Sequence, residues 1–325
     1  MPVTKTGFKM NQFSAGTLYD KFFYWDAVNA KWQTSLYGNI DMEVGKGYSI
    51  RGPQSFDTTT PSTFTGVFTG VPNNGDINVA VTANKWNFIG NPYPSAIDAE
   101  DLIFNNNLGA VYLWTHNLLP ALASGSSTYY YASDDYAVIN GTGQVEGPQV
   151  GGPFQGYIAA GQAFIAKPTT STVNFNNNLR VGGNNTQFYK TAKTNTREKN
   201  RLWLTLTNTQ GAYKQALLGY IEGATNNVDY NFDAATISGN SFIDFYTVNG
   251  TSKLSIQGRG LPFDSSDLVP VGYKSTIAGD FTIAIDHADG FFDTQAVYLE
   301  DKTTGKITDL RKENYTFKTA IGTFT

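Results

Sequence analysis

Short segments in which every second residue is apolar place the strongest constraint on how this chain folds. Leu202, Leu204 and Leu206 share one side of an extended chain, and the residues between them take the other side. The same alternation returns in Phe281–Ile285 and in Tyr315–Phe317. A period of two residues is typical of a half-buried β-strand, whereas an amphipathic helix repeats about every 3.6 residues. The sequence therefore predicts antiparallel sheets with one buried face.

The first half of the chain carries further short apolar runs, each bounded by Gly, Asn or Pro. Among these runs are Phe22–Trp25, Ile77–Val81, Trp86–Ile89, Ala163–Ala166 and Val173–Phe175. This spacing of strands and turn residues is typical of a β-sandwich or jelly roll. Near the C-terminus, Thr303–Lys306 lies between two alternating runs, and its Gly305 predicts a hairpin turn.

A polar, basic stretch separates the two halves. Lys190–Arg201 contains five basic residues, one acid and almost no apolar side chain, so it cannot bury a face and is expected to be a linker. We therefore predict an all-β chain with very little helix, built from two antiparallel β-sandwich domains of jelly-roll or Ig-like type in tandem. The first covers 1–190, a linker covers 191–201, and the second covers 202–325. Because strand-like sequence runs up to Thr325, the second sandwich would lack its last strand if that strand lies further on.

Composition excludes several classes of function. Charged residues make up 15% of the chain and the net charge is −4, which is not the charge distribution of a nucleic-acid-binding surface. Cysteine is absent, so disulfides, thiolate nucleophiles and cysteine-ligated metals are excluded. No apolar run approaches the roughly 20 residues that span a bilayer, so membrane insertion is not expected. The large share of Asn, Thr, Ser and Gly is typical of extracellular β-proteins.

The segment from Trp86 to Asp101 predicts a strand followed by a rigid corner. Pro92 and Pro94 end the strand because proline lacks a backbone donor and has a fixed φ. Ser95 and Asp98 have the spacing of a helix N-terminal capping box, which predicts a short helix over 95–104. We interpret this corner as structural.

Several motifs, in their order along the chain, resemble those of a known group of exported proteins. These motifs lie at Tyr24–Asp26, Gly45–Pro53, Thr63–Asp76, Gly90–Ala99, Val111–Asn117, Asp135–Gly141, Gly156–Lys167, Gly219–Ala234, Lys253–Phe263, Tyr298–Gly305 and Tyr315–Phe324. They resemble the C-terminal region of large adhesin-like proteins exported by the type IX secretion system of gliding bacteria, upstream of the sorting domain. The resemblance implies an extracellular or cell-surface location and partners among the secretion machinery or other surface proteins.

Catalytic residues are not predicted. The chain has two histidines, His116 and His287. His287 follows Asp286, but adjacent residues on a strand normally face opposite ways, which argues against a catalytic pair. Carboxylates that could serve a glycosidase occur at Asp134–Asp135, at Asp264 with Asp267, and at Asp98–Asp101. Acids in such loops are most often helix caps and solvated turns.

One loop carries oxygen ligands at every second position. Asn227, Asp229, Asn231 and Asp233 have the spacing of side chains that could hold Ca²⁺. The other interpretation is a cluster of Asx turns in which these side chains accept hydrogen bonds from their own backbone. The sequence leaves both interpretations open.

A run of tyrosines is the candidate sugar-binding surface. Tyr129, Tyr130 and Tyr131 follow a Gly- and Ser-rich stretch, with Trp114 nearby in the sequence. Exposed aromatic rings there could form a platform for glycans, although most aromatic residues of a β-protein pack in its core.

Three functions follow from these observations, in order of preference. The first is a non-enzymatic cell-surface module of a secreted adhesin, serving presentation, spacing and protein interaction. The second is a carbohydrate-binding module of a secreted enzyme. The third is a polysaccharide hydrolase that uses loop carboxylates.

Overall fold

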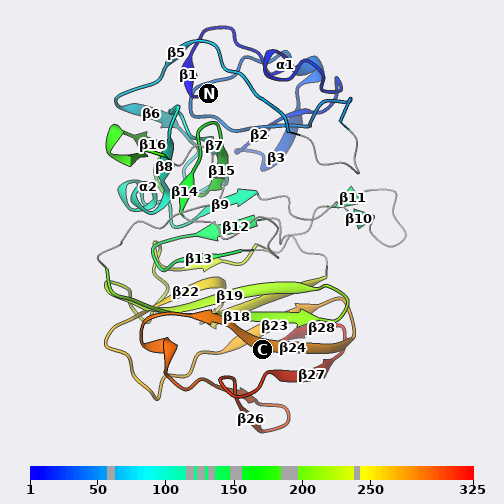
Figure 1. Cartoon of the computed structure of the whole chain (residues 1–325), viewed down its shortest axis with the longest axis vertical. Coiled ribbons are helices and arrows are strands. Elements are labelled where there is room, and N and C mark those ends of the chain that lie inside the picture. The colour runs from blue at the N-terminus through cyan, green and yellow to red at the C-terminus, as the bar shows by residue number, and fades with distance from the viewer. Residues whose placement is uncertain are drawn as a thin grey trace. The chain divides into compact units, whose positions relative to one another are not determined.

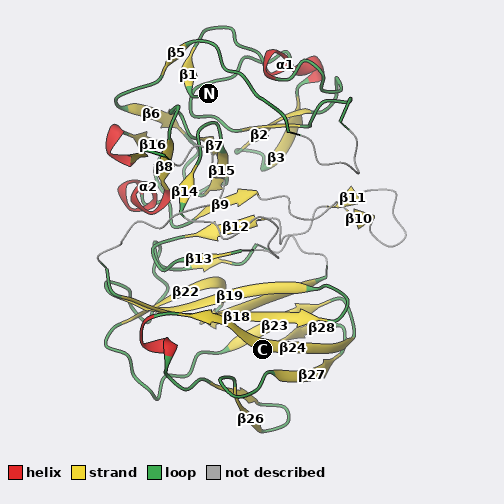
Figure 2. Ribbon diagram, in the orientation of Figure 1, coloured by secondary structure: helices red, strands yellow, loops and turns green. Residues whose placement is uncertain are grey.

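The computed structural model describes residues 1–56, 63–114, 121–122, 129–130, 136–146, 156–183, 197–237 and 242–325. These residues are mainly β-strands, and the few helices are short (Figures 1 and 2). The all-β prediction is confirmed. None of the helices in the described ranges is long and apolar enough to cross a membrane.

The chain divides into two compact units. Unit 1 is Met1–Leu113 with Gln155–Lys190, and unit 2 is Trp114–Phe154 with Thr191–Thr325. The sequence predicts one boundary, at a linker over 191–201, whereas each unit in the structure contains two separate stretches of chain. Residues 199–201 of that predicted linker begin strand β18 (Lys199–Asn208).

Unit 1 contains several small antiparallel sheets. Strands β2 (Phe22–Asp26), β3 (Lys31–Thr34) and β4 (Tyr48–Ile50) form one sheet in the order β3-β2-β4. In the other sheets of unit 1, β15 pairs with β7 and β9, β8 pairs with β14 and β17, β16 pairs with β6, and β1 pairs with β5. Their bounds are β1 (Val3–Thr4), β5 (Val71–Pro72), β6 (Ile77–Ala80), β7 (Asn87–Gly90), β8 (Ala96–Asp98), β9 (Val111–Trp114), β14 (Tyr157–Ile158), β15 (Ala163–Ala166), β16 (Thr172–Phe175) and β17 (Arg180–Val181).

The predicted corner in unit 1 is confirmed as a structural element. Tyr93 is fully buried, and its hydroxyl donates to Gly75 O at 2.6 Å. Asn91 Nδ2 donates to Ser95 O at 2.8 Å and to Ile158 O at 3.0 Å, which joins the corner to β14. These bonds satisfy the backbone carbonyls of Gly75, Ser95 and Ile158 and hold the corner in place.

The helix after the corner starts later than predicted. Helix α2 covers Ala99–Asn106, and Asp98 is its N-cap, accepting a hydrogen bond from Asp101 N at 2.9 Å. Ser95, the predicted cap, instead accepts a hydrogen bond from Arg180 Nε at 2.9 Å. The helical elements of unit 1 are α2, α1 (Met10–Phe13), η1 (Leu36–Gly38) and η3 (Asn177–Leu179).

Unit 2 is built on one nine-stranded sheet with the order β27-β24-β18-β19-β22-β21-β23-β28, to which β20 adds by pairing with β22. Only β19 and β22 run parallel; the other neighbours are antiparallel. The bounds are β19 (Tyr213–Ile221), β20 (Ala234–Ala235), β21 (Ile243–Asn249), β22 (Ser252–Gly260), β23 (Val271–Ser275), β24 (Gly279–Ala288), β27 (Tyr315–Thr319) and β28 (Gly322–Phe324).

This sheet curls so that its two edge strands approach each other at one end. β27 and β28 lie at opposite ends of the strand order, yet only residues 320 and 321 separate them in the chain. Three Cα steps reach at most roughly 11 Å, so the two edge strands must approach each other. Across this gap the hydroxyls of Tyr273 and Thr319 are 2.9 Å apart. The predicted sandwich of two facing sheets is therefore not confirmed for unit 2.

The concave side of the curled sheet holds the core of unit 2. Leu202, Leu204 and Leu206 pack there together, as their alternation predicts. Phe292 of the short helix η4 (Gly290–Asp293) joins the same cluster. The hairpin of β25 (Tyr298–Asp301) and β26 (Lys306–Asp309) turns at Gly305, whose φ is +72°, so that predicted turn is confirmed.

A hairpin from the first half of the chain packs on the other face of this sheet. It consists of β12 (Tyr136–Ile139) and β13 (Gln144–Val145). Thr142, in its turn, donates a hydrogen bond to Phe232 O at 2.6 Å. A Cβ atom on Gly219 would lie 2.7 Å from Thr142 Cγ2, and one on Gly258 would lie 2.6 Å from Thr142 Oγ1. The hairpin can approach because both sheet positions are glycine.

Candidate functional site

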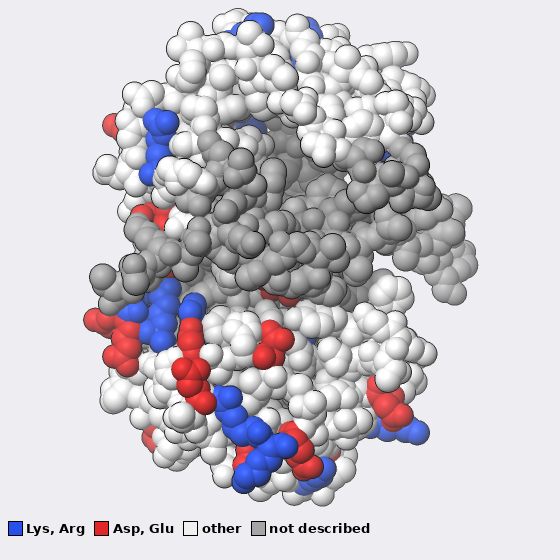
Figure 3. Space-filling view, in the orientation of Figure 1, with Lys and Arg blue, Asp and Glu red and all other residues white. Residues whose placement is uncertain are grey.

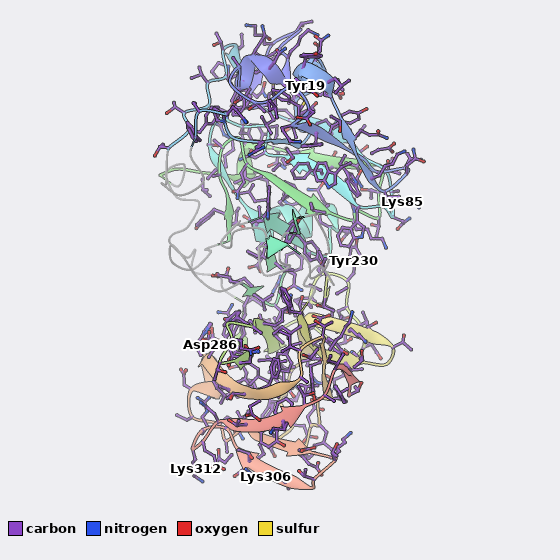
Figure 4. The ribbon with its side chains drawn as sticks, turned by 90° about the vertical axis from the view of Figure 1, so that its right-hand side faces the viewer. Tyr19, Lys85, Tyr230, Asp286, Lys306 and Lys312 are labelled. Atoms are coloured by element: carbon purple, nitrogen blue, oxygen red, sulfur yellow. The ribbon has the colours of Figure 1, made fainter. Side chains whose placement is uncertain are left out.

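Two exposed tyrosines that are far apart in the sequence lie side by side on unit 1. The ring centroids of Tyr19 and Tyr37 are 5.3 Å apart and their planes are inclined by 32°. Tyr19 is 50% exposed and Tyr37 is 67% exposed. Tyr19 lies at the surface in the N-terminal part of the chain (Figure 4). We call these two residues the tyrosine pair.

The backbone of Tyr37 is held in a conformation that tyrosine rarely adopts. Its φ is +61°, in the left-handed region that costs an L-residue roughly 1–2 kcal/mol. Two hydrogen bonds fix it there: Tyr37 N donates to Tyr19 O at 2.7 Å, and Asn11 Nδ2 donates to Tyr37 O at 2.9 Å. Strain of this kind persists only where the surroundings enforce it, and it is concentrated at functional sites.

Gly38 completes the turn that presents the pair. Its φ is +59°, and a Cβ atom there would lie 2.9 Å from both Asn11 N and Phe22 Cδ1. Phe22 is only 2% exposed and belongs to a core cluster of unit 1. The turn is thus packed directly on the core, which makes the position of Tyr37 rigid.

Two ion pairs lie in the sequence that flanks the tyrosine pair. Lys21 Nζ lies 2.8 Å from Asp20 Oδ2, and Lys9 Nζ lies 3.0 Å from Asp41 Oδ1. The hydrogen bond from Lys21 lowers the pKa of the Asp20 carboxyl, which keeps it ionised. The tyrosine pair therefore offers ring faces and hydroxyl groups for binding.

Few features of the sequence indicate this site. Tyr19 and Tyr37 belong to separate short segments on either side of the β2–β3 hairpin, and neither residue is part of an alternating pattern. The one available signal is Tyr37-Gly38-Asn39, because Gly and Asn after an aromatic residue indicate a turn that can present a side chain.

The predicted sugar platform falls mostly outside the described residues. Trp114 ends β9 and is 43% exposed. Tyr129 and Tyr130 form β11, which pairs with β10 (Ala121–Leu122), but their side chains are not described. Tyr131 lies outside the described ranges, so this platform stays a prediction.

The loop predicted to hold Ca²⁺ is closed by hydrogen bonds from its own backbone. The Asp229 carboxylate accepts from Thr225 N and from Thr225 Oγ1, the latter at 3.0 Å. Asp233 accepts from Asp229 N at 2.6 Å and from Gly258 N at 2.9 Å. Burial raises the pKa of Asp233 to about 6. Both carboxylates thus accept from backbone N–H groups, but two of these donors lie four residues before the carboxylate and not two residues after it, as an Asx turn requires. The calcium site stays a prediction.

Asn227 and Asn231 of the same loop take part through their backbones. Asn227 N donates to Thr225 Oγ1 at 3.1 Å, and Asn231 O accepts from Gly141 N at 2.8 Å. In the ranges that the structure describes, no three His, Asp or Glu side chains converge as metal ligands.

Asp286 and His287 come together, contrary to the argument from strand alternation. Asp286 Oδ2 lies 2.7 Å from His287 Nδ1 and accepts from Gln215 Nε2 at 3.0 Å. The cause is a β-bulge: Trp203 pairs with His287 and Leu204 with Ile285, which leaves Asp286 as the extra residue. Figure 4 shows Asp286 on the β24 ribbon.

The surroundings of this pair consist of stacked and ion-paired groups. The His287 ring stacks on Trp203 with centroids 4.0 Å apart, and the Arg201 guanidinium lies 4.9 Å from the Trp203 ring. Arg201 also forms an ion pair with Asp289. Of the described hydroxyl groups, none hydrogen-bonds to the His287 ring.

Two of the other carboxylates considered for hydrolysis hold the fold. Asp98 caps α2, and Asp267 pairs with Arg259 and accepts a hydrogen bond from the Tyr220 hydroxyl. His116 and Asp134–Asp135 lie outside the described ranges.

Comparison with known proteins gives one match. The family model DUF8693, a domain of unknown function, matches residues 1–325. No curated protein and no solved structure matches the chain. The chain therefore belongs to the DUF8693 family.

Proposed function

We propose that this chain is a non-enzymatic binding module of an exported, adhesin-like surface protein, and that the tyrosine pair is its contact with carbohydrate. The observation that carries the proposal is the exposure of Tyr19 and Tyr37 together with the left-handed backbone of Tyr37. A strained, exposed aromatic residue contributes little to stability, so binding is the better explanation for its geometry.

Carbohydrate fits this surface because a sugar ring has an apolar C–H face and a rim of hydroxyl groups. The two tyrosine rings offer flat apolar faces to the C–H face of the sugar and phenolic hydroxyls to its hydroxyl groups. The neighbouring ion pairs Asp20–Lys21 and Lys9–Asp41 neutralise their own charges, which favours a neutral ligand over a strongly ionic one. On the face in view in Figure 3, charged side chains are also sparse over unit 1 and more frequent over unit 2.

The setting of the module is supported by the sequence. Its motifs resemble those of proteins exported by the type IX system, and its low charge with many Asn, Thr and Gly residues is typical of extracellular β-proteins. Presentation and spacing of neighbouring modules, and contact with other surface proteins, belong to the same proposal.

A glycan array followed by titration calorimetry tests the proposal. We expect binding to a set of neutral glycans that is weakened roughly 2- to 10-fold by Tyr19→Ala or Tyr37→Ala, since an aromatic contact contributes about 0.5–1.5 kcal/mol. Tyr298→Ala is the matched control, because Tyr298 is 65% exposed but lies on β25 in unit 2. Binding that both Tyr19→Ala and Tyr37→Ala leave unchanged would contradict the assignment of the site.

A further inference from the structure

An exposed segment of unit 1 has the side-chain alternation of a β-strand but belongs to no sheet. In residues 63–69, the rings of Phe64 and Phe68 lie 5.6 and 4.7 Å from the Phe13 ring, and a Cβ atom on Gly66 would overlap that ring. Every second residue therefore faces Phe13. We call residues 63–69 the Phe13-bound segment.

The backbone of this segment is unpaired. None of its N–H and C=O groups hydrogen-bonds to another residue in the part of the chain that the structure describes. The side chains that point away from Phe13 are exposed, and Val67 is 60% exposed. A chain with strand-like alternation and free backbone groups is a template for adding another strand.

The residues that usually prevent such pairing are missing. From Thr63 to Val71 the sequence contains no charged residue and no proline. Natural sheets protect exposed edges with Lys, Glu or Pro. The outward residues of the Phe13-bound segment are instead threonine and valine, which favour strands.

The segment is nearly palindromic about Gly66. The sequence Thr63-Phe64-Thr65-Gly66-Val67-Phe68-Thr69 reads almost the same in both directions, with Thr65 and Val67 as the one unmatched pair. Two copies placed antiparallel about a twofold axis at Gly66 bring Thr63 opposite Thr69 and Thr65 opposite Val67. Such β-branched pairs stabilise antiparallel strands, and the arrangement satisfies the symmetry of an isologous dimer.

We propose that the Phe13-bound segment pairs with the same segment of a second copy of this chain, forming a two-stranded antiparallel ribbon across a twofold axis. The contact is small, because stable interfaces bury about 1,200 Å² or more and two strands of seven residues offer less. The association is therefore weak in solution, and it strengthens where many copies are held side by side on a surface.

Sedimentation velocity of the whole chain, from micromolar to millimolar concentration, tests the association. We expect a concentration-dependent dimer that Val67→Lys weakens about tenfold by adding charge to the ribbon. Val28→Lys is the matched control, since Val28 is 68% exposed in the turn between β2 and β3. Thermal unfolding checks that both variants are folded.

A wild-type chain that stays monomeric throughout this range overturns the proposal, even if a foreign extended peptide binds the segment. A dimer that Val67→Lys and Val28→Lys weaken equally overturns it as well.

Disulfide cross-linking tests the register, because the chain has no cysteine of its own. In the predicted ribbon Thr65 faces Val67 of the other copy. An oxidised mixture of Thr65→Cys and Val67→Cys proteins should therefore give more covalent dimer than either protein alone. Equal yields from the mixture, from each single variant and from Val28→Cys would overturn the assigned register and the twofold pairing with it.

Discussion

Replacing Tyr37 by glycine should leave the protein more stable than replacing it by alanine. The φ of Tyr37 is +61°, a conformation that costs an L-residue roughly 1–2 kcal/mol and costs glycine almost nothing. Alanine at this position keeps that cost, and glycine removes it. Glycine in turn loses about 0.5–1 kcal/mol more through the flexibility of the unfolded chain. The expected net difference is about 0.5–1 kcal/mol in favour of Tyr37→Gly.

Tyr19 supplies a control of opposite sign. Its φ is not positive, so glycine gains no conformational advantage there. Tyr19→Gly should therefore be less stable than Tyr19→Ala by about 0.5–1 kcal/mol. Alanine and glycine remove the same ring contact between Tyr19 and Tyr37. The energy of this contact therefore cancels when the alanine and glycine variants of one position are compared.

Equilibrium unfolding in urea measures the four variants. With a slope of about 2 kcal/mol per molar urea, the Tyr37 variants should differ in midpoint by roughly 0.3 M. The conformational argument would be refuted if glycine were the less stable choice at both positions. If it holds, Tyr37→Gly should approach wild-type stability yet bind glycan as weakly as Tyr37→Ala, because a strained residue at a binding site trades stability for function.

Three other predictions concern unit 2. Asp267→Ala should lower the free energy of unfolding in urea by about 3 kcal/mol. The substitution leaves the Arg259 side chain, which is only 12% exposed, without its carboxylate partner. A loss below about 1 kcal/mol, as for an exposed ion pair, would contradict this. Burial raises the pKa of Asp233 to about 6, so the protonated carboxyl stabilises the fold fully below pH 4. This contribution, roughly 2–3 kcal/mol of unfolding free energy, is lost as the pH rises through 6. Asp233→Asn should remove that part of the pH dependence of stability. Calcium should not raise the melting temperature, because the carboxylates of Asp229 and Asp233 already accept hydrogen bonds from backbone N–H groups; a rise that Asp229→Asn abolishes would establish the calcium interpretation instead.

Sequence patterns identified which residues face inward, because that information is local. The alternation of Leu202, Leu204 and Leu206 predicted the buried face of β18, and the prolines predicted the corner at Tyr93. Alternation does not say which strand lies beside which. β27 and β28 approach each other only when all the strands from β18 to β28 pair in one particular order. This part of the chain is more than 100 residues long.

Local irregularities explain why two groups of side chains were not predicted. Asp286 and His287 share a side because a bulge inserts one residue opposite β18, and a bulge leaves no mark in an alternating pattern. Tyr37 meets Tyr19 because its backbone is left-handed, a conformation that sequence normally predicts only for Gly, Asn or Asp. Both sites depend on backbone geometry that is unusual for the residues concerned.

The organisation of unit 2 shows how an earlier stretch of the chain joins the fold that follows the predicted linker. Trp203 Nε1 donates to Gln144 O at 2.7 Å, and Glu146 N donates to Gln215 Oε1 at 3.2 Å, so the inserted hairpin binds the sheet through side chains of β18 and β19. Gly219 and Gly258 leave the space into which Thr142 fits. Glycine inside a strand weakens it, and that cost is offset only when the hairpin is in place. Residues 136–146 therefore belong to the fold of the second half of the chain, although the linker follows them in the sequence.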